Sequence, residues 1–479
     1  MRVLTVVLLG LVLVTVAKPA ECAAQEDPLG AAALRPARYE LDLRLDYEDE
    51  KLFSRVSLTV ANRSATPTDQ LPILLYRTLT VTGVEDAEGR AVQFEQGVAA
   101  FHDWPQRQAN VITVRLSEPL APGDSATVVI SYEGYLLGYA ETGTRYQKDR
   151  IDPEFTIIRR DPYAYPIVSH PSLQSMRAAG LPQFDYRAKI TVPESVTVAN
   201  VGRLVGHEVE GGNASWIYEN HRTAWRMDFA IAQYGVHEAG GHKVFYFPED
   251  SAGARRVMDG LTGTLALYSG WFGPQRGEAR FTLIEIPDGW GSQTDVTGII
   301  QTAAAFRDPA RSHELYHEVS HLWNVVDPGP APPRWNEGLA EFLSELTTEE
   351  LEGGEAVATA VEEQLRWIRE RFGARPRYTG IPMADYGREN ITGLSYHVGI
   401  VMFAVLYDLV GAETFNEIVG GFYQRYADTG ATTDEFVVYA KSVSGMNLGR
   451  FFHDWMYTTE WYTHVRDGAA LEDLVTLYR

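Results

Sequence analysis

Cysteine is almost missing from this sequence. The single cysteine, Cys22, lies in the N-terminal segment, so the remainder of the 479-residue chain has no thiol for a disulfide bond or a thiolate metal site. Any metal ion would therefore be held by histidine and carboxylate side chains.

Positive charge is also scarce. The chain has 42 lysine and arginine residues against 64 aspartate and glutamate residues, a formal net charge of −22, and it shows no basic cluster. Nucleic acids and anionic membrane surfaces both bind positively charged patches, so we expect neither as a partner.

The N-terminus carries a mostly apolar stretch. Arg2 precedes a mostly apolar stretch over residues 3–17, which is short for a membrane-spanning helix, and the small residues Cys22 and Ala24 precede Gln25. We expect residues 1–24 to be a signal peptide and the mature protein to be secreted or periplasmic. If the segment is not cleaved, it would tether the protein to a membrane. We expect no stable membrane span elsewhere, and the oligomeric state stays open.

The first half of the chain carries the pattern of β-strands. At 45% hydrophobic and 11% aromatic residues, the composition is sufficient for two cores. Residues 39–47 alternate apolar and polar side chains, as a strand with one buried face does. The same pattern recurs at residues 56–60, 112–116, 126–132, 188–192 and 225–231. We predict a β-rich domain over residues 35–238.

The second half has mainly helical spacing. After Gly240 and Gly241, where we place the domain boundary, two strands at residues 242–247 and 281–286 flank an amphipathic stretch that starts near Ala254. Helical patterns then follow at residues 355–371, 396–409, 414–426, 433–444 and 448–458. Residues 242–479 are thus predicted to form a mainly helical domain, and the fold class is α+β with more than one domain.

A candidate metal site lies in the segment HELYHEVSHLW. His317 and His321 are one helical turn apart and project from the same face, with Glu318 between them. Catalytic zinc takes three protein ligands and leaves one position open, so a third donor is required. Glu337, on the helical pattern WNEGLAEF that follows a proline-rich loop, is the candidate.

The same segment contains a second, overlapping motif. His313, Glu314 and His317 repeat the spacing one turn earlier, and only one of the two motifs can hold the metal. We favour the later one, with His317 and His321 as ligands. The alternative in which all these side chains lie on a solvated helix face stays open.

These residues carry a resemblance to a known family. HEVSHLW followed by WNEGLAEF resembles the HExxHxW and NEG signatures of the aminopeptidase N family of gluzincin zinc metallopeptidases. The resemblance implies that His317, His321 and Glu337 bind one zinc ion per chain and that Glu318 is the general base. Trp323 supports the same motif, and Glu341, one turn beyond Glu337, is the fallback ligand.

The resemblance also implies a fold. The segment GLPQFDYRAKITVP is similar to one in the saddle-like N-terminal domain of that family, and NLGRFFHDWMYTTEW is similar to the end of its thermolysin-like catalytic domain. The chain would be a short form without the C-terminal helical domain of many relatives. Residues 322–336, between the second histidine and Glu337, form a shorter interval than is usual in the family, which implies a shortened loop.

The family's catalytic tyrosine corresponds by position to Tyr396. This residue stands in LSYHVGIVMF, where Gly399 also matches the family pattern but Val398 replaces its lysine. The hydroxyl would donate a hydrogen bond to the oxyanion of the tetrahedral intermediate. A purely structural tyrosine is the alternative reading, and Tyr386 is the alternative donor.

The motif that binds the substrate's α-amine in the family, GxMEN, is missing here. Aligning Gly298 with the glycine that follows the motif puts Asp295 at the position of the acid. Asp295 is therefore the predicted contact for the substrate's ammonium group, with a solvated loop aspartate as the alternative.

The function implied is that of an exported zinc aminopeptidase that acts on peptides. Two alternatives remain. The first is a zinc endopeptidase, or a hydrolase of another bond, on the same scaffold, which the missing GxMEN motif allows. The second is a binding module with a structural metal ion or none, for which Glu318 beside an open coordination position has no evident use.

Overall fold

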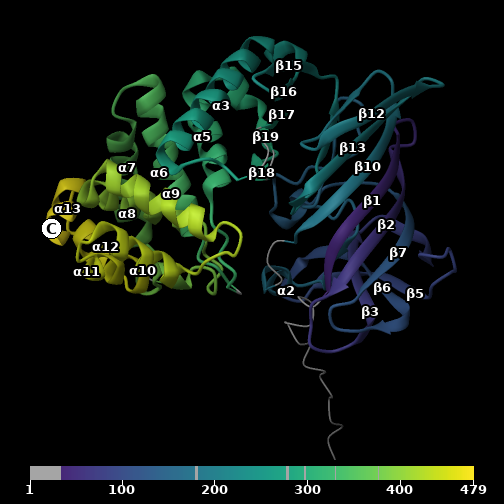
Figure 1. Cartoon of the computed structure of the whole chain (residues 1–479), viewed down its shortest axis with the longest axis horizontal. Coiled ribbons are helices and arrows are strands. Elements are labelled where there is room, and N and C mark those ends of the chain that lie inside the picture. The colour runs from purple at the N-terminus through teal and green to yellow at the C-terminus, as the bar shows by residue number, and fades with distance from the viewer. Residues whose placement is uncertain (1–33, 179–181, 277–279, 296–297, 330, 376) are drawn as a thin grey trace, which may run out of the picture.

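The computed structural model describes residues 34–479 except 179–181, 277–279, 296–297, 330 and 376, and it leaves out the side chains of residues 221–223. The predicted signal peptide lies outside the described residues. The chain folds into a β-rich half and a mainly helical half that lie next to each other along the long axis of the molecule (Figure 1).

The β-rich half is built on a seven-stranded sheet in the order β12-β13-β10-β1-β2-β7-β4, in which only β1 and β10 pair in parallel. The strands are β1 (Leu34–Asp46), β2 (Lys51–Asn62), β4 (Leu79–Asp86), β7 (Ser125–Gly134), β10 (Phe184–Pro193), β12 (Arg203–Glu210) and β13 (Asn213–Ala224). In β1 the buried residues alternate with more exposed ones between Leu41 and Leu45, as the sequence pattern predicts.

Two smaller sheets complete this half. One has the order β5-β6-β3-β9 and the other the order β11-β14-β8. Their strands are β3 (Thr68–Tyr76), β5 (Phe94–Phe101), β6 (Trp104–Leu120), β8 (Thr156–Ile158), β9 (Ile167–Val168), β11 (Thr197–Ala199) and β14 (Phe229–Ala232), and a short helix, α2 (Leu173–Ala178), follows β9.

One predicted strand is shorter than its sequence pattern. The strand expected over residues 225–231 begins only at Phe229. Just before it, the buried side chain of Arg226 forms ion pairs with Asp161 and Asp228. The other five predicted strands are confirmed to within one residue. In chain order, they fall in β1 (residues 39–47), β2 (56–60), β6 (112–116), β7 (126–132) and β10 (188–192).

The second half begins with a five-stranded sheet in the order β15-β16-β17-β19-β18. Its strands are β15 (Gly235–Ala239), β16 (His242–Tyr246), β17 (Thr282–Ile286), β18 (Gln293–Asp295) and β19 (Gly298–Thr302). Gly240 and Gly241, at the expected boundary, form the turn between β15 and β16 with φ values of 59° and 87°, which glycine adopts readily. This sheet therefore starts at Gly235.

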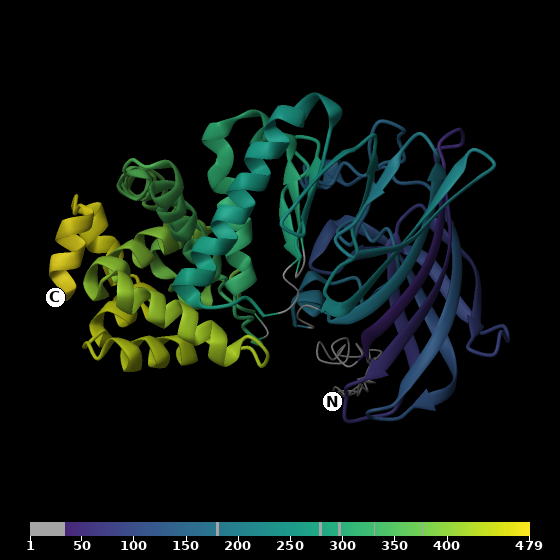
Figure 2. The ribbon, with the colours of Figure 1, turned by 45° about the horizontal axis from the view of Figure 1, so that its top comes forward.

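Helices make up the remainder of this half. They are α3 (Ser251–Phe272), α4 (Ala303–Arg307), α5 (Ser312–Ser320), α6 (Trp335–Glu352), α7 (Ala356–Trp367), α8 (Leu394–Val410), α9 (Ala412–Tyr426), α10 (Thr433–Ser444), α11 (Gly449–Phe452), α12 (Glu460–Arg466) and α13 (Leu471–Tyr478). The five-stranded sheet stands between α3 and the β-rich half (Figure 2).

Apolar side chains from both halves join the two parts. Phe155, Ile157 and Ala230, from the β-rich half, form one buried cluster with Ile284 and Ile300 of the five-stranded sheet and with their neighbours. Burial of this cluster stabilises the contact by the hydrophobic effect, so the five-stranded sheet has a fixed position against the β-rich half.

Two glycines allow α6 and α8 to cross closely. A Cβ atom on Gly338 would lie 2.4 Å from the Cα of Gly399, and one on Gly399 would lie 2.7 Å from the Cα of Gly338. No larger residue fits at either position without separating the helices. The crossing brings Glu337, beside Gly338, close to Tyr396, which lies one turn before Gly399.

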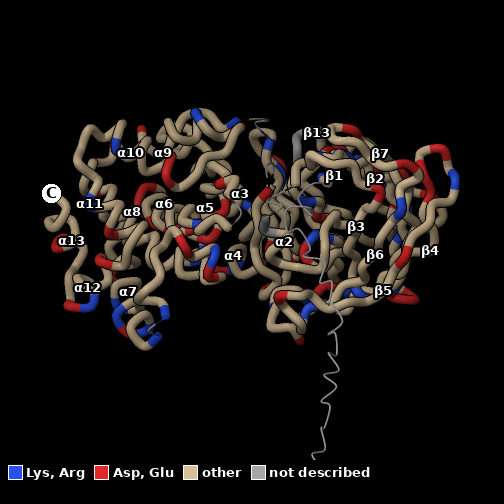
Figure 3. Tube along the Cα trace, turned by 90° about the horizontal axis from the view of Figure 1, so that it is seen from below, with Lys and Arg blue, Asp and Glu red and all other residues tan. Residues whose placement is uncertain are grey.

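Charged residues of both signs occur along the whole described chain. Acidic residues are distributed along both halves with basic residues between them (Figure 3). No single helix among the described residues is long and apolar enough to cross a membrane, while α8 and α9 reach that length and hydropathy only as a pair bent by 120°.

A buried glutamate in the five-stranded sheet makes stability depend on pH. Glu285 of β17 has no exposed surface, and its Oε2 accepts a hydrogen bond from the main-chain nitrogen of Phe247 at 2.6 Å. Burial, together with the neighbouring Asp250 carboxyl group, raises the pKa of Glu285 to about 9 from an ordinary value of 4.5. The folded chain therefore holds a proton that the unfolded chain releases, and this carboxyl group destabilises the fold progressively as pH rises from about 4.5 to about 9.

We accordingly expect Glu285→Gln to stabilise the protein at neutral and alkaline pH. The amide is neutral in both states, so the gain is absent below about pH 4.5 and reaches about 1–3 kcal/mol at pH 7. Thermal unfolding midpoints at pH 4.5 and pH 8 measure the effect, with the exposed Glu249→Gln as the control. An equal change at both pH values would contradict the assigned protonation.

Candidate metal centre

The structure brings together the three side chains predicted as metal ligands. His317 lies on α5, His321 begins the 3₁₀ turn His321–Trp323 that continues this helix, and Glu337 lies in the first turn of α6. Nε2 of His317 and Nε2 of His321 are 3.2 Å apart, and Oε2 of Glu337 is 3.5 Å from each of them. Their side chains are only 13%, 18% and 4% exposed.

These distances fit a zinc ion. Zinc bonds of about 2.0–2.1 Å in tetrahedral geometry place neighbouring donor atoms about 3.3 Å apart. The three observed separations lie close to this value, and two neutral histidines with one carboxylate are a donor set that zinc prefers. Within the described part of the chain, this is the one group of three histidine, cysteine or acidic residues with metal-binding geometry.

The electrostatics of the group also favour a cation. Burial would raise the pKa of Glu337, but His321, His317 and Arg334 hold it well below its usual range, so the carboxylate is ionised. Burial alone would lower the pKa of His317, whereas the Glu337 and Glu341 carboxylates raise it to about 10. A metal ion would displace the proton that these carboxylates attract, so metal affinity should decrease at low pH.

In the overlapping motif, the side chains of His313 and Glu314 contact other groups and not the predicted metal ligands. Nδ1 of His313 lies 3.1 Å from the main-chain oxygen of Ala310, in the preceding turn. Glu314 forms an ion pair with Arg311, and a hydrogen bond of 3.4 Å from Gln301 reaches its other oxygen. The geometry therefore favours the later motif.

Two further side chains fix the orientation of the predicted ligands. Nδ1 of His317 lies 3.3 Å from Oε1 of Glu341, which leaves Nε2 directed at the other ligands. Glu341, the fallback ligand, thus stands behind His317 as an outer carboxylate, a common partner of a metal-binding histidine. Arg334 has φ of 60° and pairs with Oε1 of Glu337, so Oε2 of that carboxylate faces the histidines.

Tyr396 lies beside the metal group. Its ring is parallel to the imidazole of His317, with centroids 5.9 Å apart. Burial raises the pKa of Tyr396 above its ordinary value and the Glu337 carboxylate raises it further, so the hydroxyl remains protonated and can donate. Tyr386, the alternative donor, is fully buried in the hydrophobic core of the helical half.

Glu318, the predicted general base, faces β18. The hydroxyl of Thr294 donates a hydrogen bond to its Oε2 at 2.5 Å and lies 3.1 Å from its main-chain oxygen. Thr294 was not predicted from the sequence, because a threonine in a short strand carries no motif. Only the packing of β18 against α5 reveals it.

Asp295 is the next residue of the same strand. Successive side chains of a strand point to opposite faces, so Asp295 projects away from Glu318 and toward the β-rich half. It is 6% exposed, and its charge contributes to the raised pKa of Tyr186 on β10. A contact between Asp295 and a substrate ammonium group stays a prediction.

A pocket of about 320 Å³ opens beside Tyr396. It is lined by Tyr396, Glu341, Gln364, Gly393 and His397. His397 is fixed by a contact of 2.8 Å between its Nδ1 and Oε1 of Gln364, and its ring stacks on Trp367. The pocket has the volume of a small ligand site and adjoins the predicted metal ligands through Glu341.

The two-domain arrangement has the fold of solved M1 zinc metallopeptidases. The M1 zinc metallopeptidase from Deinococcus radiodurans superposes with a TM-score of 0.65 at 17% sequence identity, covering 88% of this chain and 94% of that one. A mutant of it bound to a Tyr-Ser-Ala substrate gives a TM-score of 0.66 at the same identity and coverage.

The sequence comparison points the same way. No family model matches the chain. The curated protein "Aminopeptidase M1-A" of Oryza sativa subsp. japonica is 22% identical over 456 residues, and the match covers 88% of this chain and 50% of the rice protein. The chain thus spans about half the length of this relative. The predicted fold class and the resemblance to the aminopeptidase N family are confirmed.

Proposed function

We propose that this chain is a zinc-dependent metallopeptidase that removes residues from the N-termini of peptides. The single observation that carries the proposal is the geometry of His317, His321 and Glu337, with donor atoms 3.2–3.5 Å apart beside an acid and a tyrosine. The similarity to the rice aminopeptidase and to a structure bound to a tripeptide supports peptides as the substrate class.

We assign the roles of the chain's residues from the family resemblance, and their positions in the structure support these roles. A zinc ion held by the three ligands would polarise the scissile carbonyl and lower the pKa of a water molecule. Glu318 accepts a proton from that water and passes it to the leaving amine. The hydroxyl of Tyr396 donates a hydrogen bond to the oxygen that becomes negatively charged. The pocket beside Tyr396 can accept a substrate side chain.

Substrate termini distinguish the aminopeptidase from the endopeptidase alternative. An aminopeptidase must bind a free ammonium group, and Asp295 is the acid that the alignment places at that position. Asp295→Asn is expected to raise KM for free peptides by about tenfold or more with little effect on zinc content, as loss of a ground-state contact would. Steady-state kinetics with matched free and N-acetylated peptides measure this.

The matched control is Glu249→Asn, an exposed acid outside the site. If the unmodified protein cleaves N-acetylated and free peptides equally fast, the endopeptidase reading replaces the aminopeptidase one. If only the unblocked peptides are cleaved and Asp295→Asn has no effect, another group binds the ammonium.

Export is a further part of the proposal. It rests on the N-terminal sequence, in which a short apolar stretch and small residues precede Gln25. The N-terminal residue of the protein isolated from its native source tests it, because cleavage predicts Gln25 and a membrane tether predicts an intact N-terminus.

A further inference from the structure

Two consecutive residues of β18 connect α5, the helix that carries His317 and Glu318, to the β-rich half. Thr294 donates a hydrogen bond to Oε2 of Glu318 at 2.5 Å. Gln293, whose side chain projects from the other face of the strand, donates from Nε2 to Oδ1 of Asp161 at 3.3 Å. The strand thus contacts the predicted base on one face and the β-rich half on the other.

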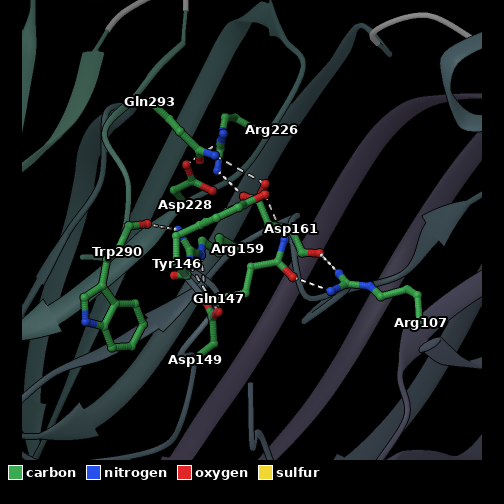
Figure 4. Close-up of polar contacts among 10 residues, drawn as sticks. All are labelled: Arg107, Tyr146, Gln147, Asp149, Arg159, Asp161, Arg226, Asp228, Trp290 and Gln293. Carbon is green, nitrogen blue, oxygen red and sulfur yellow. Dashed lines mark hydrogen bonds and ion pairs between the residues drawn. The ribbon is translucent and has the colours of Figure 1, made fainter. Parts of the chain in front are cut away.

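The loop that leads into β18 is held at a second point. Arg159 has no exposed surface, and its guanidinium donates from Nη1 to the main-chain oxygen of Trp290 at 3.2 Å. The same guanidinium donates two hydrogen bonds to Asp149, at 2.7 Å and 3.1 Å, so it cannot swing away without leaving a buried carboxylate unpaired (Figure 4). Arg159 therefore fixes the start of the loop.

The acceptor of Gln293 is fixed as well. Oδ2 of Asp161 accepts a hydrogen bond from Nη2 of the buried Arg226 at 2.8 Å, and Arg226 also pairs with Asp228. Burial would raise the pKa of Asp161, but Arg226 and Arg159 lower it to about 2, so the group is an ionised acceptor at neutral pH. Arg159 and Asp161 belong to one short segment of the β-rich half, and both reach the β18 loop.

We propose that Thr294 is a positioning residue for Glu318, and that residues 159–161 of the β-rich half hold β18 where Thr294 reaches that carboxylate. The inference rests on the proposed function, since the orientation of Glu318 affects the rate only if this group transfers the proton. A carboxylate on a rotatable side chain presents either oxygen in many orientations. A hydrogen bond to one oxygen leaves the other to meet the water, and small displacements of a reacting group reduce rates strongly.

Kinetics of Thr294→Val and Thr294→Ser in the zinc-loaded full chain test the positioning role. Valine keeps the shape of threonine and removes the hydroxyl, so we expect kcat to fall by about 10- to 100-fold, the loss typical of a hydrogen bond to a charged group. KM should stay within about twofold and zinc content should not change. Serine restores the hydroxyl and should recover at least about one third of the lost activity.

Thr282→Val is the matched control. Thr282 lies on β17 of the same sheet, and its hydroxyl has no hydrogen-bond partner among the described residues. We expect its kcat to stay within about twofold of the unaltered protein. Gln293→Met, which removes only the contact with Asp161, should lower kcat by a smaller factor of about 3 to 10.

A second readout does not depend on activity. In the metal-free chain, the changes in thermal unfolding midpoint caused by Thr294→Val and Glu318→Ala should be less than additive when combined, because both remove the same hydrogen bond. Additive changes would overturn the inference. So would a Thr294→Val effect on KM alone, or a serine variant as slow as the valine variant.

Failure of the proposed peptidase function can be distinguished from failure of the inference about Thr294. If the unaltered zinc-loaded chain hydrolyses no peptide, the enzymatic proposal fails and the positioning role in catalysis fails with it. If the unaltered chain is active and Thr294→Val matches it, only the inference about Thr294 is overturned.

Discussion

Glu318→Gln is expected to reduce peptide hydrolysis by about 10²- to 10⁴-fold without loss of zinc. The amide has nearly the same shape as the carboxylate and can still accept the hydrogen bond from Thr294, but it cannot take a proton from water at neutral pH. The measurement pairs kcat/KM with metal analysis of the same preparation.

The matched control for this change is Glu314→Gln. Glu314 is the acid of the overlapping motif, one helical turn earlier, and its carboxylate pairs with Arg311. We expect this variant to retain most activity. If Glu314→Gln were inactive and Glu318→Gln active, the earlier motif would be the catalytic one.

Removal of a metal ligand should weaken zinc binding by a factor similar to the loss of activity expected for Glu318→Gln. His321→Ala and Glu337→Ala each remove one of three protein ligands, and we expect zinc affinity to fall by about 10²- to 10⁴-fold, roughly a third of a binding free energy on the order of 10 kcal/mol or more. Competition with a chromogenic chelator measures the affinity directly, without relying on activity.

His313→Ala is the control for the ligand assignment. Its ring contacts the main chain of the preceding turn and lies outside the metal group, so the variant should bind zinc as the unaltered chain does. Loss of zinc from His313→Ala with retention in His321→Ala would show that the earlier motif binds the metal.

The metal group could be predicted from the sequence because its spacing is local. His317 and His321 are one turn apart, which fixes their common face on a helix. Glu337 required more, because it lies on a separate helix, α6, and only the packing of α6 against α5 brings it to the two histidines. Its identity as the third donor therefore came from the resemblance and not from spacing alone.

The surroundings of the metal group could not be predicted, because they come from distant parts of the chain. Thr294 reaches Glu318 only because β18 pairs with β19 at the edge of the five-stranded sheet and lies against α5. Asp161 and Arg226 lie more than sixty residues apart in sequence and meet only through the fold. Hydrophobic periodicity identifies strands and helices, but it gives no information on such polar pairs.

Asp295 illustrates a limit of alignment in a short strand. The alignment rests on a single glycine, Gly298, and a one-residue shift in a strand moves a side chain to the opposite face. In the structure, the neighbouring residue Thr294 faces α5 and contacts Glu318. The KM of Asp295→Asn for free peptides tells whether Asp295 or another group binds a substrate's ammonium.

We expect His317, His321 and Glu337 to hold a zinc ion that this chain uses for peptide hydrolysis. Titration of the metal-free full chain with zinc, following hydrolysis of an unblocked peptide, tests it most directly. We predict no hydrolysis without metal, a linear rise in rate with added zinc, and a break at one zinc ion per chain. If zinc binds at one equivalent and no peptide is hydrolysed at any ratio, the site is structural, the chain is a binding module, and the proposed peptidase activity is contradicted.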